Sequence, residues 1–453
     1  MTVKAEVASP PTGGGVISRV LMFFVNLMQK YLPDPFTIAW LITLLVCVMA
    51  LTITRTAPLK IVTDWGSHFF GILAFAMQMT LVVVTGYALA MSKYVRNFLK
   101  MLVAIPKTPV QTVLFVALIS MVLYYVNWGL GLIAGALLAK EAGKQHADVD
   151  FRLLVTAAFS GIIITHGGLS ASIPLLISTK GHFLEKEIGL VPLSQTIFGT
   201  QNLVITAALV VIIPLACTLL FPKREDMVLV DPAVFDEEKE EPTLPESATT
   251  LADRFDRSRL LKYSLGLMGA AYLGIQFSNG VFNLNVLIFL FLILGIFAHG
   301  SLVDYAKVLT KGALSCGGII LQFPFYAGIM GIMEGSGLVL VISDWLLQLA
   351  TYETFEIYCY LSSVIISIFV PSAGGHWVVQ APFMLPAAAK LGVEPWRVAM
   401  GVAWGESIWN IVCPFWALPV LAIAKVGLRD LIGFSVILFL IGNVVALTGI
   451  YLF

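Results

Sequence analysis

The chain has 453 residues, of which 58% are hydrophobic and only 12% are charged, and its mean hydropathy is +0.92. This composition excludes an ordinary soluble globule and indicates a polytopic membrane protein. The 27 basic residues balance the 27 acidic ones, which argues against a nucleic-acid partner because such partners leave a basic footprint on the protein. The five cysteines lie singly in apolar stretches, so we expect no disulfide, metal cluster or cofactor.

Apolar segments near the length of a membrane span, which is about 20 residues, follow one another from residue 36. The first half predicts two spans, a helical hairpin, a broken helix and a plain helix, at about 36–54, 69–91, 110–139, 151–178 and 193–221. The second half predicts three spans, a short surface helix, a hairpin, a broken helix and a plain helix, at about 260–277, 283–299, 312–333, 338–349, 355–389, 396–424 and 428–453.

Two polar segments lie outside the predicted membrane spans, one before the first span and one between the two halves of the chain. Residues 1–35 predict a cytoplasmic tail with an interfacial helix over 16–31, because polar and apolar residues alternate there over less than a membrane span. Residues 222–259 are rich in proline and acidic residues and predict a mobile cytoplasmic linker. The chain therefore divides into two membrane repeats, 36–221 and 260–453, joined by this linker.

The order of hairpin, broken helix and plain helix occurs in both repeats. Five crossings separate the two hairpins, and because five is odd, the hairpins enter the membrane from opposite faces. We therefore predict an all-α polytopic membrane protein with an inverted repeat, two re-entrant hairpins and two broken transmembrane helices. The segment 110–139 is too long for one untilted crossing and too short for two, and a single kinked, tilted span is the alternative to a hairpin.

The basic residues predict the orientation, because cytoplasmic loops carry an excess of Lys and Arg. With this topology, one face holds only Arg55, Lys60, Lys180, Lys186, Lys390 and Arg397, and the other 21 of the 27 lie on the face of the N-terminus and the linker. We therefore expect the N-terminus and first hairpin to be cytoplasmic and the second hairpin and C-terminus to be external. The predicted location is the cytoplasmic (inner) membrane.

Four interruptions rich in Gly, Ser and Asn lie within these apolar segments. Non-helical backbone at membrane depth is stable only where it is buried in protein or lines a water-filled cavity. Paired interruptions in two repeats therefore indicate a binding site near the midplane of the membrane. Helix ends in such gaps offer N–H groups to an anion and carbonyl groups to a cation. The candidate substrate-binding residues are Asn127, Trp128, Gly129, His166, Gly167, Gly168, Ser170, Ser172, Ser372, Gly374, Gly375, His376, Ser407 and Asn410.

Three ionisable residues, His166, His376 and Glu406, lie in these interruptions, which the sequence places at 166–168, 374–376 and 405–407. Ionisable groups at membrane depth are costly and typical of function, so we expect them to carry the coupling ion. The alternatives are neutral histidines bonded to backbone and a structural carboxyl. A coupling Na⁺ would have oxygen ligands at Asn127, Ser170, Ser372 and Asn410.

No Lys or Arg lies in any interruption, so the predicted site has no fixed cationic group. A small anion with a single charge fits such a site better than a multiply charged one, although helix ends alone can hold a dicarboxylate. Trp128, Trp377 and Trp409 lie beside the interruptions and offer an apolar wall to a short alkyl tail, or else are ordinary core aromatics.

At these motifs the chain resembles the short-chain fatty acid transporter family, within the ion transporter superfamily of inverted-repeat carriers. The resemblance runs from about residue 33 to the C-terminus and is carried by residues 127–129, 166–170, 371–377, 405–410 and 414–419. It implies uptake of acetate, butyrate or acetoacetate with a coupling cation, by an elevator-like movement in a homodimer. Relatives often have Asp where this chain has Glu406, which leaves H⁺ and Na⁺ both open as the coupling ion.

Three other readings remain. A dicarboxylate carrier of the same superfamily is the nearest alternative. A membrane hydrolase would use Ser170 or Ser172 as the nucleophile beside the His-Gly-Gly segment, but no strand-turn-helix context surrounds it and the repeat would be unexplained. A channel has no need of two opposed hairpins. We therefore expect a carrier and not an enzyme.

Overall fold

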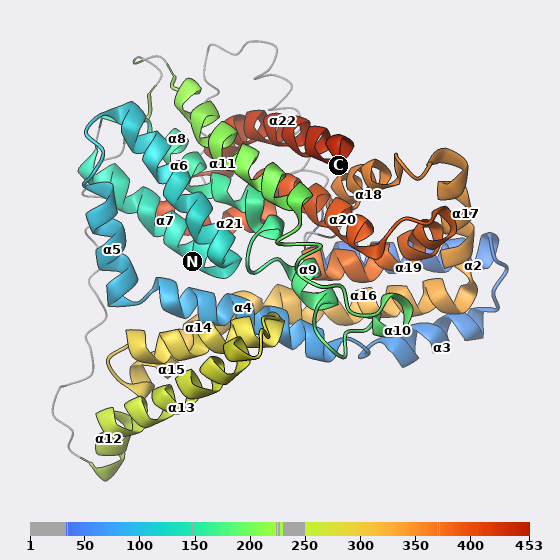
Figure 1. Cartoon of the computed structure of the whole chain (residues 1–453), viewed down its shortest axis with the longest axis horizontal. Coiled ribbons are helices and arrows are strands. Elements are labelled where there is room, and N and C mark those ends of the chain that lie inside the picture. The colour runs from blue at the N-terminus through green and yellow to red at the C-terminus, as the bar shows by residue number, and fades with distance from the viewer. Residues whose placement is uncertain are drawn as a thin grey trace.

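The computed structural model of the protein describes residues 33–222 apart from 34 and 147, residues 224 and 227–229, and residues 250–453 apart from 369 and 371. Every regular element in these residues is helical (Figure 1), so the prediction of an all-α membrane protein is confirmed. Six helical segments are long and apolar enough to cross a membrane: Leu73–Ala90, Pro109–Val126, Phe151–Ile177, Thr200–Leu219, Leu302–Ser336 and Asp430–Leu452. The expected interfacial helix and most of the acidic linker lie outside the described residues.

The helices of the first half follow the predicted order, with short helices between the longer ones. They are α2 (Pro35–Thr52), α3 (Pro58–His68), α4 (Leu73–Ala90), α5 (Lys93–Val103), α6 (Pro109–Val126), α7 (Trp128–Gln145), α8 (Phe151–Phe159), the 3₁₀ helix η1 (Ser160–Gly167), α9 (Ser172–Ile177), α10 (Glu185–Ile188) and α11 (Thr200–Leu219). The basic helix α5 is absent from the sequence-based prediction.

The second half begins with α12 (Leu251–Asp256) at the end of the linker. Its helices are α13 (Arg259–Ser278), α14 (Leu284–Ala298), α15 (Leu302–Ala313), η4 (Leu314–Cys316), α16 (Gly317–Ser336), α17 (Leu338–Leu349), α18 (Phe355–Ile366), α19 (Ala373–Leu391), α20 (Pro395–Trp409), η5 (Asn410–Val412), α21 (Pro414–Ala424) and α22 (Leu428–Leu452).

The first hairpin turns at one residue, Asn127, as predicted. Asn127 has extended backbone angles, and its side-chain oxygen accepts a hydrogen bond from the Leu130 N–H at 2.9 Å, which caps α7. The two arms pack side by side because Gly131 has no side chain: a Cβ there would lie 2.5 Å from the Tyr124 ring. Whether this hairpin re-enters the membrane from one face stays a prediction.

The second hairpin turns earlier than the sequence suggests. Gly374, Gly375 and His376 are predicted at the turn, but they lie in the first turn of α19, which begins at Ala373, whereas α18 ends at Ile366. The two glycines serve close packing instead. A Cβ at Gly374 would lie 2.8 Å from the Phe75 ring of α4, and one at Gly375 would lie 2.4 Å from the Tyr326 ring of α16.

The first broken helix matches its prediction and the second does not. In the first, η1 ends at Gly167 and α9 begins at Ser172. In the second, α20 continues through Glu406, so the prediction of a break at 405–407 is wrong, and the break lies at 410–413. The reason is Pro414, which cannot continue the hydrogen-bond ladder and places Cys413 in an extended conformation (φ −77°, ψ 117°).

The helices form two groups in space (Figure 1). The lower group in this view contains α2, α3, α4 and α13 to α16, and the upper group contains α6 to α8, α11, α18 and α20 to α22. Hairpin one packs against α4 of the lower group through Gly129. A Cβ at Gly129 would lie 3.0 Å from the Val82 oxygen, so the two backbones lie close together there. The repeat boundaries 36–221 and 260–453 stay predictions.

Labelling from the two faces of the membrane tests the inverted topology. Thr108 and Glu353 are exposed residues at the bases of the first and second hairpins. In a background without the five native cysteines, we expect Thr108→Cys to react with an impermeant thiol reagent only from the cytoplasmic face. Glu353→Cys should react only from outside. Reaction of both from one face would exclude opposed hairpins.

Candidate functional site

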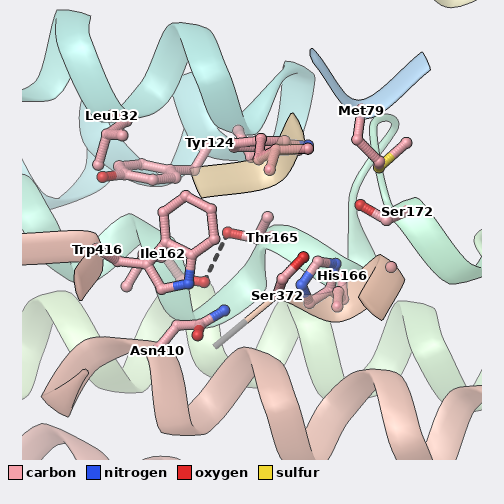
Figure 2. A pocket seen from close by; sticks show the side chains of 14 residues that line it. Met79, Tyr124, Leu132, Ile162, Thr165, His166, Ser172, Ser372, Asn410 and Trp416 are labelled. Atoms are coloured by element: carbon pink, nitrogen blue, oxygen red, sulfur yellow. Dashed lines mark hydrogen bonds between the residues drawn. The ribbon is translucent and has the colours of Figure 1, made fainter. Parts of the chain in front are cut away.

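A small cavity lies where hairpin one, hairpin two and the two broken helices meet. Its volume is about 30 Å³, which in this conformation accommodates a ligand of only a few heavy atoms. Figure 2 shows its lining, which comes from Met79, Tyr124, Trp128, Leu132, Ile162, Thr165, His166, Ser172, Ile319, Ser372, Ala373, Gly374, Asn410 and Trp416. Apart from Met79 of α4 and Ile319 of α16, these residues come from the hairpins and the broken helices.

Five residues of this lining each carry a buried polar atom without a hydrogen-bond partner. The atoms are Tyr124 Oη, Trp128 Nε1, His166 Nδ1, Asn410 Oδ1 and Trp416 Nε1. Buried polar atoms are normally paired, and each exception calls for an explanation. The tyrosine hydroxyl and both indole N–H groups are donors. Several unpaired donors around one small cavity are therefore suited to a ligand that is rich in acceptors, such as a carboxylate.

The rest of the lining is largely apolar. Met79, Leu132, Ile162 and Ile319 supply aliphatic surface, which suits a short alkyl chain. Among the residues that the structure describes, no lysine or arginine lines the cavity. Within the described lining, the site therefore combines hydrogen-bond donors with apolar walls and has no fixed cationic side chain.

His166 and Glu406 form a buried pair beside the cavity. His166 Nε2 lies 2.5 Å from Glu406 Oε2, and the exposed fractions of the two side chains are 5% and 0%. The same carboxylate oxygen accepts a hydrogen bond from Asn410 Nδ2 at 2.8 Å, while Glu406 Oε1 has no partner. Glu406 lies in α20 and not in a break, but its partners His166 and Asn410 both line the cavity.

Hydrogen bonds tie the first broken helix to α20 and to the tip of hairpin one. The His166 backbone N–H donates to Ser407 Oγ at 3.2 Å, and that hydroxyl donates to the Ile163 carbonyl at 2.7 Å. At the tip of hairpin one, the Trp128 backbone N–H donates to Ser170 Oγ at 2.9 Å. Ser407 and Ser170 therefore position the site, although neither lines the cavity.

The structure brings only part of the predicted substrate-binding set to the cavity. Trp128, His166, Ser172, Ser372, Gly374 and Asn410 line it, whereas Asn127, Gly129, Gly167, Gly168, Ser170, Gly375, His376 and Ser407 do not. Two of these glycines are packing positions: a Cβ at Gly167 would lie 2.7 Å from the Trp404 ring, and one at Gly168 would lie 2.5 Å from the Tyr125 oxygen. The substrate-binding role of the set stays a prediction.

His376 does not line the cavity and belongs to a buried hydrogen-bond network of hairpin two. Its Nδ1 lies 3.2 Å from Ser367 Oγ, and its Nε2 is hydrogen-bonded to Gln380 Oε1. Gln380 Nε2 in turn donates to Ser362 Oγ at 2.8 Å. The network holds hairpin two together, and both ring nitrogens of His376 bond to side chains and not, as the alternative expected, to the backbone.

The oxygens proposed for Na⁺ do not converge on the cavity. Of Asn127, Ser170, Ser372 and Asn410, only the last two line it, and Asn127 and Ser170 accept hydrogen bonds from backbone N–H groups. Within the described residues, no group of three or more His, Cys, Asp or Glu side chains could hold a metal ion. In the same part of the chain, no hydrogen bond joins a histidine to Ser170 or Ser172, the serines of the hydrolase alternative.

A second, larger cavity of about 580 Å³ adjoins the first. The two share Trp128, Leu132, Ile319 and Trp416, and the larger one continues along α4, α7 and α21. The rings of Trp128 and Trp416 meet edge to face, with centroids 5.4 Å apart and an interplanar angle of 78°. The tryptophan pair therefore lies at the boundary between the small cavity and the larger one.

Sequence reasoning missed Met79, Tyr124, Leu132, Ile162, Thr165, Ile319 and Ala373 in the lining. A local feature of the sequence points to Tyr124, because this residue lies three positions before the hairpin turn, at the end of the helix that leads into the turn. Trp416 lies in a segment that carried the family resemblance but was not singled out. Met79 and Ile319 reach the cavity only through the packing of α4 and α16, which no local pattern reveals.

Solved structures of transporters share this fold. The Alcanivorax borkumensis YdaH transporter, whose structure is described as having an unusual topology, superposes with a TM-score of 0.59 at 18% identity, over 93% of this chain and 97% of that one. Neisseria gonorrhoeae MtrF, described with a class of antimetabolite efflux pumps, superposes with a TM-score of 0.52 at 15% identity, over 96% and 97%. At these identities, the likeness establishes the fold.

The membrane-length helices define a multi-pass helical membrane protein. The family model for short chain fatty acid transporters matches residues 16–453. A protein of Escherichia coli (strain K12) named as a candidate short-chain fatty acid transporter is 40% identical over 97% of this chain and all of its own length. A relative of the same name from Haemophilus influenzae is 38% identical over 96% of this chain. The chain belongs to the short-chain fatty acid transporter family.

Proposed function

We propose that the protein is a cation-coupled secondary transporter of short-chain monocarboxylates such as acetate, butyrate or acetoacetate. The observation that carries this proposal is the small buried cavity lined by unpaired Tyr and Trp donors. A carboxylate accepts hydrogen bonds from these donors, and its short alkyl tail packs on the aliphatic wall. Because the described lining contains no lysine or arginine, a second carboxylate would be buried there without a positive partner, which is costly. This disfavours the dicarboxylate alternative.

The His166–Glu406 pair supports H⁺ as the coupling ion. If Nε2 donates to Glu406, a neutral imidazole presents a lone pair at Nδ1, whereas the protonated ring presents an N–H there. Nδ1 is unpaired and His166 lines the cavity. Proton uptake by the pair therefore converts a group that repels a carboxylate into one that binds it. Substrate and proton would bind together, which is the requirement for symport. Na⁺ is the alternative coupling ion.

The position of the cavity supports an elevator-like movement. It lies between the lower helix group, which contributes Met79 and Ile319, and the hairpins and broken helices, which contribute the other lining residues. Movement of the hairpins and broken helices past the lower helix group would expose the site to each face of the membrane in turn. We further propose opposed re-entrant hairpins, a homodimer, and the cytoplasmic membrane as location with the N-terminus inside. These follow the inverted-repeat interpretation, the basic-residue bias and the family.

Uptake by purified protein in liposomes tests the substrate class. We expect radiolabelled acetate or butyrate to be accumulated when an ion gradient is imposed, and succinate or citrate to inhibit poorly. Imposing a proton gradient or a Na⁺ gradient separately identifies the coupling ion. Transport of a dicarboxylate without any transport of a monocarboxylate would refute the proposed substrate class.

A further inference from the structure

Helix α5 joins the ends of α4 and α6 and runs crosswise to α4 (Figure 1). One face of α5 is buried, with Leu99 1% and Val103 0% exposed. A second face carries large apolar side chains that nothing in the described structure covers: Tyr94, Phe98 and Met101 are 70%, 50% and 61% exposed. The spacing of these three residues, four and then three, places them on one stripe of the helix.

A basic stripe lies beside the apolar one. Lys93, Asn97 and Lys100 are exposed at the same helical spacing, and Lys107 is exposed shortly after the helix. Residues 91–111 contain no aspartate or glutamate. An apolar stripe next to a basic stripe, on a helix that lies across the end of a membrane span, is typical of a helix at the level of the lipid headgroups.

A crevice of about 380 Å³ begins where the basic stripe ends. Its apolar lining comes from Ile105, Pro106, Leu114, Phe115 and Leu118, and Lys107 lies at the same crevice. A single ammonium group beside an apolar crevice matches the two parts of a phospholipid, a negative headgroup and an acyl chain. The absence of acidic residues in this segment favours an anionic headgroup over a zwitterionic one.

We propose that α5 and this crevice form a binding site for an anionic phospholipid. Lys93, Lys100 and Lys107 bind the headgroup, and an acyl chain lies along the apolar stripe and enters the crevice. The site is attached to the transport machinery, because Gln145 and His146 at the end of α7 bond to the α5 backbone. Gln145 Nε2 donates to the Lys100 oxygen at 3.4 Å, and His146 Nε2 lies 3.0 Å from the Val103 oxygen.

The consequence concerns hairpin one. Its second arm, α7, begins at the cavity with Trp128 and ends against α5. A bound lipid that holds α5 at the membrane surface also holds the base of this hairpin in place. We therefore expect anionic lipid to slow the movement of this hairpin and so to lower the rate of transport, in addition to binding at the site.

The test compares two proteins that lose the same charge. In the first, Lys93, Lys100 and Lys107 are each replaced by Gln. In the control, Lys180, Lys186 and Lys307, which are exposed and lie outside α5, are each replaced by Gln. Binding of phosphatidylglycerol to purified protein is measured by native mass spectrometry. A basic residue at an anionic membrane surface strengthens binding about fivefold, so three should contribute about a hundredfold.

We expect the α5 variant to lose phosphatidylglycerol binding and the control to keep it, with Lys→Arg replacements at the same three positions also keeping it. Transport is then compared in vesicles of phosphatidylcholine alone and of phosphatidylcholine with phosphatidylglycerol in equal parts. Only the α5 variant should be insensitive to the lipid. Equal binding by wild type and the α5 variant, or equal losses in both variants, overturns the proposal. The binding result does not depend on which substrate is carried, so it is separable from failure of the proposed function.

Discussion

The variant Glu406→Gln is expected to abolish gradient-driven accumulation of substrate while still exchanging substrate across the membrane. The amide mimics a carboxyl that is permanently loaded with a proton, because its N–H can donate to His166 Nε2 and leave the imidazole proton on Nδ1, the state that binds a carboxylate. Because the pair can no longer release its proton, the return of the empty carrier is not coupled to the gradient. The ratio of internal to external substrate should fall to unity, measured in liposomes with an imposed proton gradient.

Two further variants separate coupling from general damage. Glu406→Asp retains a carboxyl and should retain accumulation, at a reduced rate because the shorter side chain reaches His166 less well. Glu334→Gln changes an exposed glutamate at the end of α16 that does not line the cavity, and it should behave as wild type. Should Glu406→Gln accumulate substrate to the wild-type ratio, Glu406 has a structural role and the coupling group must be sought elsewhere.

The sequence predicts this fold well where a polar or flexible residue interrupts a long apolar run. Asn127 is such a residue, and the structure turns at it because Asn both ends α6 and caps α7. The first break is equally clear, because His166, Gly167 and Gly168 occur together inside an apolar segment. Both features are local, so a pattern of residues suffices to place them.

The second break was misplaced because glycine has two uses in packed membrane helices. Gly405 suggested an interruption, but it lies within α20, where a Cβ would be 2.4 Å from the Tyr360 oxygen. It allows close packing of α18 and α20. Pro414 was the better signal for the break, because proline restricts the backbone of the residue before it. A glycine alone does not distinguish a break from a packing contact.

The candidate site was predicted only in part, for a related reason. The sequence singles out His166 and Glu406 because ionisable groups at membrane depth are costly, and Asn410 because it is an amide in an interruption, and the structure brings the three together. The apolar half of the lining, including Met79 and Ile319, carries no such cost and cannot be distinguished from ordinary core residues. Its position depends on how α4 and α16 pack on the hairpins, which is a tertiary property. The sequence does not single out Trp416 either. This residue lies between the two cavities, so a substitution there can test its role.

The variant Trp416→Leu is expected to let the carrier accept longer acids. Trp416 and Trp128 lie between a cavity of about 30 Å³ and one of about 580 Å³, and a smaller side chain joins the two spaces. Each further methylene that becomes buried contributes about 0.8 kcal/mol. The two extra methylenes of hexanoate should therefore raise its transport relative to butyrate by about tenfold, measured as the ratio of kcat/KM values in liposomes.

Two tryptophan variants give this experiment its controls. Trp416→Phe keeps an aromatic wall but removes the indole donor, so it should weaken all the acids alike and leave the ratio of hexanoate to butyrate near that of wild type. Trp409→Leu makes the same change of size at a tryptophan that packs on Phe439, with ring centroids 5.7 Å apart, and lines neither cavity. An unchanged ratio in Trp416→Leu, or an equal shift in Trp409→Leu, would mean that the tryptophan pair does not set chain length. The limit on substrate size would then lie in the other walls of the small cavity, at Met79, Leu132 and Ile319.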